Sequence, residues 1–131
     1  MSNTRAHNDI ETALYELLTA DNYSASAHAV PASLGSTMPH VHVVATGGYT
    51  DSMVIESHNV DFDVYAGDPA DAMEAASSLC DWVRGLAGTE VGTECYESEI
   101  NTLPYHNPDP RHSTIARATF KALITTRTKG A

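Results

Sequence analysis

Three histidines occupy positions where two neighbouring strands could bring their rings together. His40 and His42 are two residues apart in a valine-rich run, so in a strand both side chains project from one face. His58 lies on the segment expected to return beside that strand. Neutral imidazole nitrogens bind zinc, but a closed zinc site needs a fourth ligand, and no nearby pattern supplies one. We therefore interpret the histidines as polar residues of a sheet face, with a zinc site as the alternative.

Two carboxylates of the same region, Asp61 and Asp63, also share one face of the expected strand. Such a pair can act in general acid–base catalysis or bind a hard cation. Alternating aspartates are more typical of a solvated face or of an electrostatic lining, and we favour that interpretation. No serine lies in a G-x-S-x-G motif, and Gly47-Gly48 lacks the G-K-[ST] continuation of a phosphate-binding loop. The sequence thus predicts neither an enzyme nor a cofactor.

Two segments have the spacing of amphipathic helices. The first is expected over residues 10–20, with Asn8 as its N-cap. The second is expected to begin after Asp68 as N-cap, with Pro69 at its first position, and to stop at Gly88. The apolar stripes consist of Ile10, Ala13, Leu14, Leu17 and Leu18 in the first helix, and of Ala72, Met73, Ala76, Leu79, Cys80, Val83, Leu86 and Ala87 in the second.

The remaining segments predict a sheet. Val60, Phe62 and Val64 alternate with more polar neighbours, so one face should be buried and the other wet. Gly47-Gly48 is expected to form a tight hairpin turn. Strands are expected at residues 24–30, at 40–46, on the return after Gly47-Gly48, at 91–102 and from 116 onward, with loops at 31–39 and 103–111. The return strand is irregular at first and alternates cleanly over residues 60–65.

The resulting order is α-β-β-β-α-β-β. It predicts an α+β fold, in which a small, mostly antiparallel sheet is flanked by two helices. A chain of 131 residues builds one hydrophobic core, so a single domain over residues 1–131 is expected, with residues 1–8 flexible.

Charge is segregated along the chain. Residues 111–131 hold five of the seven basic side chains and no acidic one, whereas residues 1–110 hold all 17 aspartates and glutamates. We therefore expect Arg117, Lys121 and Arg127 to face outward and to contact an acidic neighbour, in another copy or in a partner. The net charge of −10 argues against tight, sequence-independent DNA binding.

Trp82, beside the stripe of the second helix, is either an interface anchor or the rim of the core.

Other features limit the class of protein. Cys80 and Cys95 form no metal-binding motif and no disulfide framework, so we expect reduced structural thiols in an intracellular protein. No apolar run approaches the roughly 18 residues needed to span a bilayer, and the start of the chain lacks the apolar region of a signal peptide.

Several stretches, taken in order over residues 9–127, resemble the tail terminator (tail completion) proteins of long-tailed double-stranded DNA viruses. The matching pieces are PHVHVVATGG at residues 39–48, VDFDVYAGD at 60–68, DAMEAA at 71–76, PDPRH at 108–112, and ARATF at 116–120 with Arg127 beyond it. The His40/His42 pair, the Ala-rich first strand and the acidic excess depart from the family pattern.

The resemblance implies a structural virion protein rather than an enzyme. Six copies would form a ring that caps the head-proximal end of the tail tube, stops tube polymerisation and joins the tail to a head connector or stopper protein. DNA would pass through the lumen without specific binding, and the protein would assemble in the host cytoplasm and reside in the tail neck. The candidate lumen-lining residues are Asp61, Asp63, Glu94, Glu97 and Glu99.

Three alternatives remain at this stage. Neck and head-completion connector proteins share a similar α+β style. A metal-binding or small enzymatic domain would centre on His40, His42 and His58. A small dimeric binding module is the third alternative.

Overall fold

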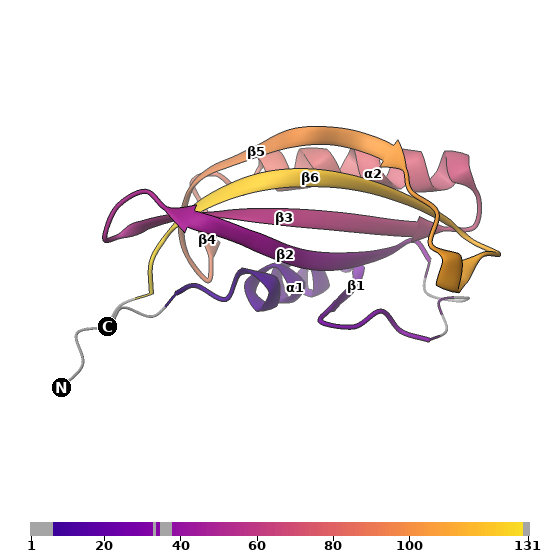
Figure 1. Ribbon diagram of the computed structural model, residues 1–131, viewed down its shortest axis with the longest axis horizontal. Helices are drawn as coiled ribbons and strands as arrows, with labels where there is room; N and C mark the ends of the chain where they lie inside the picture. Colours follow the sequence, from indigo (N-terminus) through magenta and orange to yellow (C-terminus); the bar gives the residue numbers. More distant parts are fainter. Residues whose placement is uncertain (1–6, 33, 35–37, 130–131) are drawn as a thin grey trace.

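A mostly antiparallel sheet carries both helices on one of its faces (Figure 1). The computed structural model describes residues 7–32, 34 and 38–129. Strand order across the sheet is β1-β2-β3-β6-β5-β4, and only the β1–β2 pair is parallel. The elements are α1 Ile10–Ala20, β1 Ser24–Ala27, β2 His40–Thr50, β3 Ile55–Ala66, α2 Pro69–Arg84, β4 Glu90–Val91, β5 Thr93–His106, the 3₁₀ turn η1 Pro110–His112, and β6 Ala116–Arg127. The predicted α+β class and element order are confirmed, and the last but one predicted strand is divided by Gly92 into the two-residue β4 and β5.

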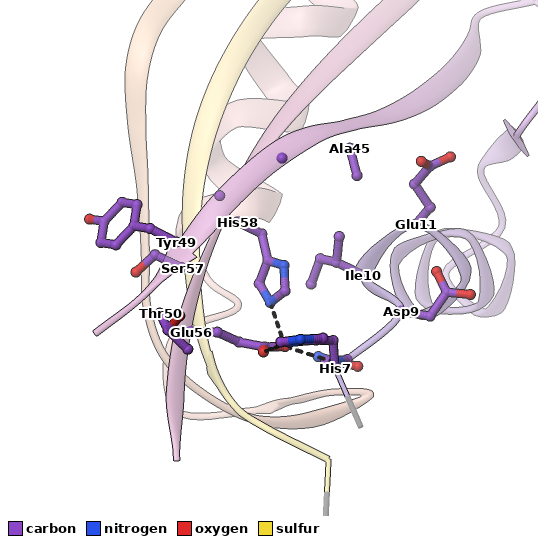
Figure 2. A pocket seen from close by; sticks show the side chains of 13 residues that line it. His7, Asp9, Ile10, Glu11, Ala45, Tyr49, Thr50, Glu56, Ser57 and His58 are labelled. Carbon is purple, nitrogen blue, oxygen red and sulfur yellow. Dashed lines mark hydrogen bonds and ion pairs between the residues drawn. The ribbon is translucent and has the colours of Figure 1, made fainter. Parts of the chain in front are cut away.

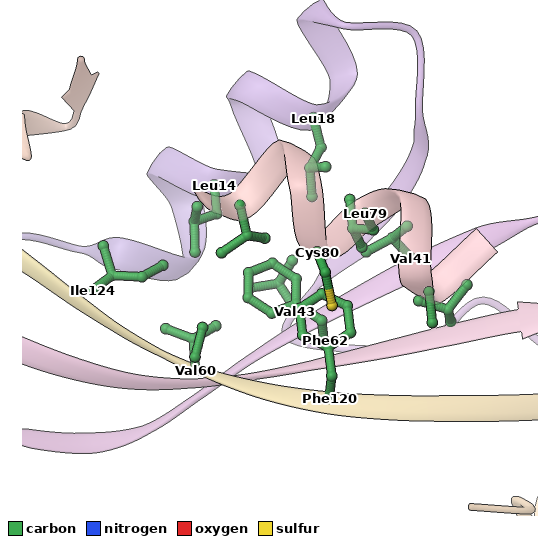
Figure 3. Packing of buried hydrophobic residues seen from close by; sticks show 14 of the residues in the cluster. Leu14, Leu18, Val41, Val43, Val60, Phe62, Leu79, Cys80, Phe120 and Ile124 are labelled. Carbon is green, nitrogen blue, oxygen red and sulfur yellow. The ribbon is translucent and has the colours of Figure 1, made fainter. Parts of the chain in front are cut away.

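The core lies between the sheet and the two helices (Figure 3). Phe62 of β3 and Phe120 of β6 are directly paired, and their rings stack with centroids 5.0 Å apart and planes 9° apart. Leu14 of α1 and Leu79 of α2 belong to the same buried cluster. Alternation therefore places the even-numbered residues of β3 and β6 toward the helices and the odd-numbered residues on the opposite face, which we call the helix-free face.

The helix ends depart from the prediction in two places. The N-cap of α1 is Asp9, which accepts a hydrogen bond from the Thr12 N–H, whereas Asn8 is buried and donates to the Val91 carbonyl at 2.7 Å. Residue 8 is therefore anchored, while residues 1–6 of the predicted flexible start lie outside the described part. The Asp68 cap of α2 is confirmed, but the helix ends at Arg84, before the predicted stop at Gly88.

Two predicted loops are strand instead. The tight turn expected at Gly47-Gly48 is an irregularity inside β2, which runs on to Thr50 before the chain reverses. Strand β5 continues through Pro104 into the expected loop at 103–111. Proline is tolerated there because the β5–β6 register is irregular between Thr102 and Tyr105 and because β5 lies near the sheet edge. The other predicted loop, at 31–39, falls partly outside the described residues.

The close approach of β3 to Gly48 yields a test of this irregularity. A Cβ atom at Gly48 would lie 2.0 Å from the Ser57 carbonyl oxygen, so Gly48→Ala forces the backbone apart. We expect Gly48→Ala to lower the free energy of unfolding by about 1–3 kcal/mol. At Gly67 nothing lies within 4 Å, and Gly67→Ala should change stability by less than about 0.5 kcal/mol. Urea titrations of both variants would contradict the described β2–β3 register if the losses were equal.

Candidate functional site

The helix-free face of the sheet is polar, but one end of it is covered. The segment that contains η1 passes over β3 and β6 at this end (Figure 1). Tyr65 is fully buried there, its hydroxyl donates to Asp109 at 2.9 Å, and His112 packs edge-on against its ring. The helix-free face, which was predicted to be solvent-exposed, is therefore exposed over only part of its length.

Arg117 lies at the centre of this covered end. Its Nη1 is 3.5 Å from the Asp109 carboxylate and 4.0 Å from that of Asp63, and its Nε donates to the Asn107 carbonyl. The Arg117 side chain is only 15% exposed and that of Asp109 only 3%. The prediction that Arg117 projects into solvent is therefore wrong, because loop 107–115 covers it and supplies its partners.

Asp109 is held in its ionised form. Burial opposes ionisation, but hydrogen bonds from the Arg111 backbone N–H and the Tyr65 hydroxyl, together with the nearby Arg117 charge, lower its pKa to about 2. Since this pKa is depressed on folding, the carboxylate stabilises the fold above its ordinary value near 3.8, and this stabilisation is lost as the pH falls toward 2.

The predicted acidic pair on β3 is matched by the basic strand beside it. Lys121 donates to Asp61 at 3.1 Å, and Thr119 donates to Asp63 at 2.7 Å. The hydrogen bond to Asp61 raises the pKa of Lys121. Lys121 remains 42% exposed at its side chain. The Lys121–Asp61 pair thus brings together a basic and an acidic residue from the two oppositely charged parts of the chain.

Arg127 and three glutamates of β5 are among the charged side chains that face solvent. Arg127, at the end of β6, is exposed and has no ion pair among the described residues. Glu94, Glu97 and Glu99 on β5 are exposed as well. Glu97 and Glu99 pair with odd-numbered residues of β6 and therefore lie on the helix-free face.

The two histidines of β2 are buried structural groups. Ser26 of β1 bonds to both rings, at 2.8 Å to His40 Nε2 and 2.8 Å to His42 Nδ1, and Ser24 bonds to His40 Nδ1 at 2.7 Å. Burial lowers the pKa of each histidine. These contacts join the Ala-rich first strand to the sheet.

The third histidine lies elsewhere. His42 is opposite Asp63 of β3. His58 precedes Asp63 by five residues on that strand, which separates the two positions by about 16 Å. Its side chain also points to the helix side of the sheet, since His58 and Val60 share the same face. The structure therefore does not bring the three predicted metal ligands together, and the described residues contain no group of three or more His, Cys, Asp or Glu placed to hold a metal ion.

Buried histidines of lowered pKa make stability depend on pH. Below the ordinary value of 6.5 the unfolded chain binds more protons than the folded one, so stability should fall as the pH drops from about 7 toward 5. Asp63 and Glu11 favour protonation of His42, and Arg111 opposes it. We expect His42→Asn to be less stable at pH 7 but to have a flatter slope between pH 7 and 5. Guanidinium titrations that gave parallel slopes would contradict a neutral, buried His42.

His58 instead lies at a hollow of about 380 Å³ between β2 and the start of α1 (Figure 2). Glu56 is buried beside it and accepts from the Asn8 backbone N–H at 2.7 Å, while His7 Nδ1 lies 2.8 Å and His58 Nε2 3.3 Å from its carboxylate. Burial opposes ionisation of Glu56, but the hydrogen bonds from His7 and Asn8 prevail and lower its pKa. Both carboxylate oxygens are thus occupied in anchoring the N-terminal segment, and they form no open acid–base pair.

Glu56 and Asp109 were not predicted as site residues from the sequence. Glu56 has the same parity as Val60 and Phe62, so extension of the alternating pattern toward the N-terminus places it on the core side. Asp109 lies within a Pro-Asp-Pro stretch, which indicates a loop with a restricted backbone. No sequence pattern near Asp109 shows that this loop covers Tyr65.

Trp82 and the cysteines complete the set of predicted residues. Trp82 packs edge-on against Tyr23 with centroids 5.9 Å apart, and its Nε1 donates to Asp21 at 2.7 Å. These contacts favour the core-rim interpretation of Trp82. Cys80 and Cys95 are buried and unlinked, and burial raises the pKa of Cys95 to about 11.

Comparison with protein-family models and with curated proteins finds no significant match to the chain. Function is therefore inferred from the residues, the fold and the resemblance in sequence pattern. Neither helix of the described region is long and apolar enough to cross a membrane.

Proposed function

We propose that this protein is a structural virion protein: a tail terminator whose copies form a ring at the head-proximal end of a viral tail tube. The ring stops tube polymerisation and joins the tail to the head connector. In support, the pieces that resemble tail terminators fall in sequence on β2, β3, α2, η1 and β6, which belong to one fold around one core.

One observation carries the proposal furthest. On the helix-free face, Lys121 and Arg117 form ion pairs with carboxylates of the same chain, whereas Glu97 and Glu99 are exposed. A lumen lined by this face would repel DNA phosphates, so that a genome could slide past without binding. Asp61 would contribute little to this repulsion, since its charge is matched by Lys121. Asp63, in contrast, accepts a hydrogen bond from the neutral Thr119 hydroxyl and lies 4.0 Å from Arg117, which also pairs with Asp109.

A six-fold ring is tested with the purified chain, alone and mixed with a viral tail tube protein from the same genome. We expect native mass spectrometry to give hexamers and electron microscopy to give rings at one end of each tube, whose growth stops. Five-fold or twelve-fold rings, or tubes that grow equally well with the chain present, would contradict the proposal. Rings that bind the head connector and not the tube would indicate the alternative, a neck or head-completion protein.

A further inference from the structure

The sheet has two open edges, one on each side. Strand β2 pairs with β1 only through residues 40–43, so in the described part of the chain residues 44–50 have no strand on their outer side. Strand β5 meets β4 at residues 93 and 94, and Cys95 is bonded on its outer side by Gly88 and Thr89. Beyond Cys95, the described residues place no strand along the outer side of β5. Unpaired backbone groups of this kind are templates for another strand.

The two open edges lie at the same position along the strand direction. Across β3 and β6, Thr102 of β5 is level with Val44 of β2, and Glu97 is level with Tyr49. The pairings β2–β3, β3–β6 and β6–β5 are all antiparallel, so β2 and β5 run in opposite directions. A copy related by rotation about an axis along the strands therefore presents its β2 antiparallel to β5, without a shift along that axis.

The side chains at the two edges are compatible with this pairing. Residues 44–50 carry no charged side chain, so the β5 glutamates would oppose no like charge. Tyr49 is 54% exposed on the β2 edge, and Tyr96 is exposed on the β5 edge close to the same level. Exposed aromatic side chains are enriched at protein interfaces. Residues 46–50 of β2 are exposed, and the hollow lined by Ala45 and residues 47–50 lies beside this edge (Figure 2).

We propose that residues 96–102 of β5 pair with residues 44–50 of β2 in the next copy, which continues the sheet from subunit to subunit. This inference rests on the proposed ring function and names the contact that builds the ring. A contact between two different edges is heterologous, and such contacts close into a ring when the rotation per copy divides a full turn. The basic terminal strand is thereby replaced as the expected subunit contact, because Arg117 and Lys121 are already paired within the chain.

The test places two carboxylates opposite each other across the proposed β5–β2 contact between copies (the seam). It then replaces one of these carboxylates with a basic side chain. Tyr49→Glu sets a carboxylate against Glu97 of the partner subunit, and we expect it to raise the concentration for half-assembly about tenfold or more, because the change is repeated at every seam. Combining Tyr49→Glu with Glu97→Lys should restore assembly. Tyr15→Glu, on the exposed side of α1, is the matched control and should assemble like the wild type. Analytical ultracentrifugation measures assembly, and circular dichroism melts verify that each variant is folded.

The outcomes separate this inference from the proposed function. Wild-type rings that Tyr49→Glu leaves unchanged, or a folded double variant that assembles no better than Tyr49→Glu alone, overturn the edge pairing and leave the ring function standing. Assemblies that respond to the charge exchange but contain other than six copies support the pairing and contradict the six-fold ring. A wild-type chain that stays monomeric at all accessible concentrations overturns both.

Discussion

Arg117→Glu is expected to lower the free energy of unfolding by more than about 3–5 kcal/mol. The substitution replaces the guanidinium between Asp63 and Asp109 with a third carboxylate, in a place where these side chains are 15% and 3% exposed. Removal of one partner from a buried ion pair costs about 3–5 kcal/mol, and a like charge in its place costs more. Since small domains have a total stability of about 5–15 kcal/mol, this loss removes a large share of the free energy of unfolding. The free energy of unfolding from urea titration measures the effect.

Arg127→Glu is the matched control. Arg127 lies on the same strand and the same face as Arg117, but it is exposed and has no ion pair in the described region. Its reversal should change stability by less than about 0.5 kcal/mol. Equal losses for the two variants would show that loop 107–115 does not hold Arg117. Any loss of self-association in Arg117→Glu would therefore report on folding and not on a subunit contact.

Phe62→Ala is expected to have the second largest effect. Phe62 is fully buried and stacks on Phe120 at the centre of the sheet, below both helices (Figure 3). Truncation removes the ring's buried apolar surface and leaves a cavity that the paired strands cannot close, at a cost of about 3–5 kcal/mol. The midpoint of urea unfolding should fall accordingly.

Phe62→Leu serves as the comparison for the cavity. It retains most of the buried volume and should recover much of the loss, although the aromatic stacking with Phe120 is gone. A Phe62→Ala variant that lost less than about 1 kcal/mol would contradict the packing of the two rings.

Local sequence patterns predicted the elements that are stabilised by interactions between residues close in the chain. The apolar stripe and the Asp68-Pro69 start of α2 lie within a few residues of each other, so spacing and capping chemistry sufficed to predict the beginning of this helix. Alternation in residues 60–65 correctly predicted which side chains of β3 face the core, because the period of a strand is two. The class and order of elements followed from these patterns.

The irregular parts of the strands were decided by the partner strand. Gly47-Gly48 is a common hairpin turn in isolation, yet the register with β3 extends β2 past both glycines and brings Gly48 against the Ser57 carbonyl. Asn8 and Asp9 are both good N-caps, and a hydrogen bond to the distant Val91 selected Asp9 by turning Asn8 inward.

The charge distribution shows the same division most clearly. The sequence alone established that acidic and basic residues are separated along the chain, and this separation suggested a basic surface that contacts an acidic partner. Only the tertiary structure decided where those charges go: β6 lies between β3 and β5, so Lys121 is placed beside Asp61, and loop 107–115 brings Asp109 to Arg117. Pairing between residues so far apart in the chain depends on strand order and register, which no local spacing encodes. Among the described residues, the same strand order leaves β2 and β5 with open edges, which are the surfaces that we propose for contact with a second copy.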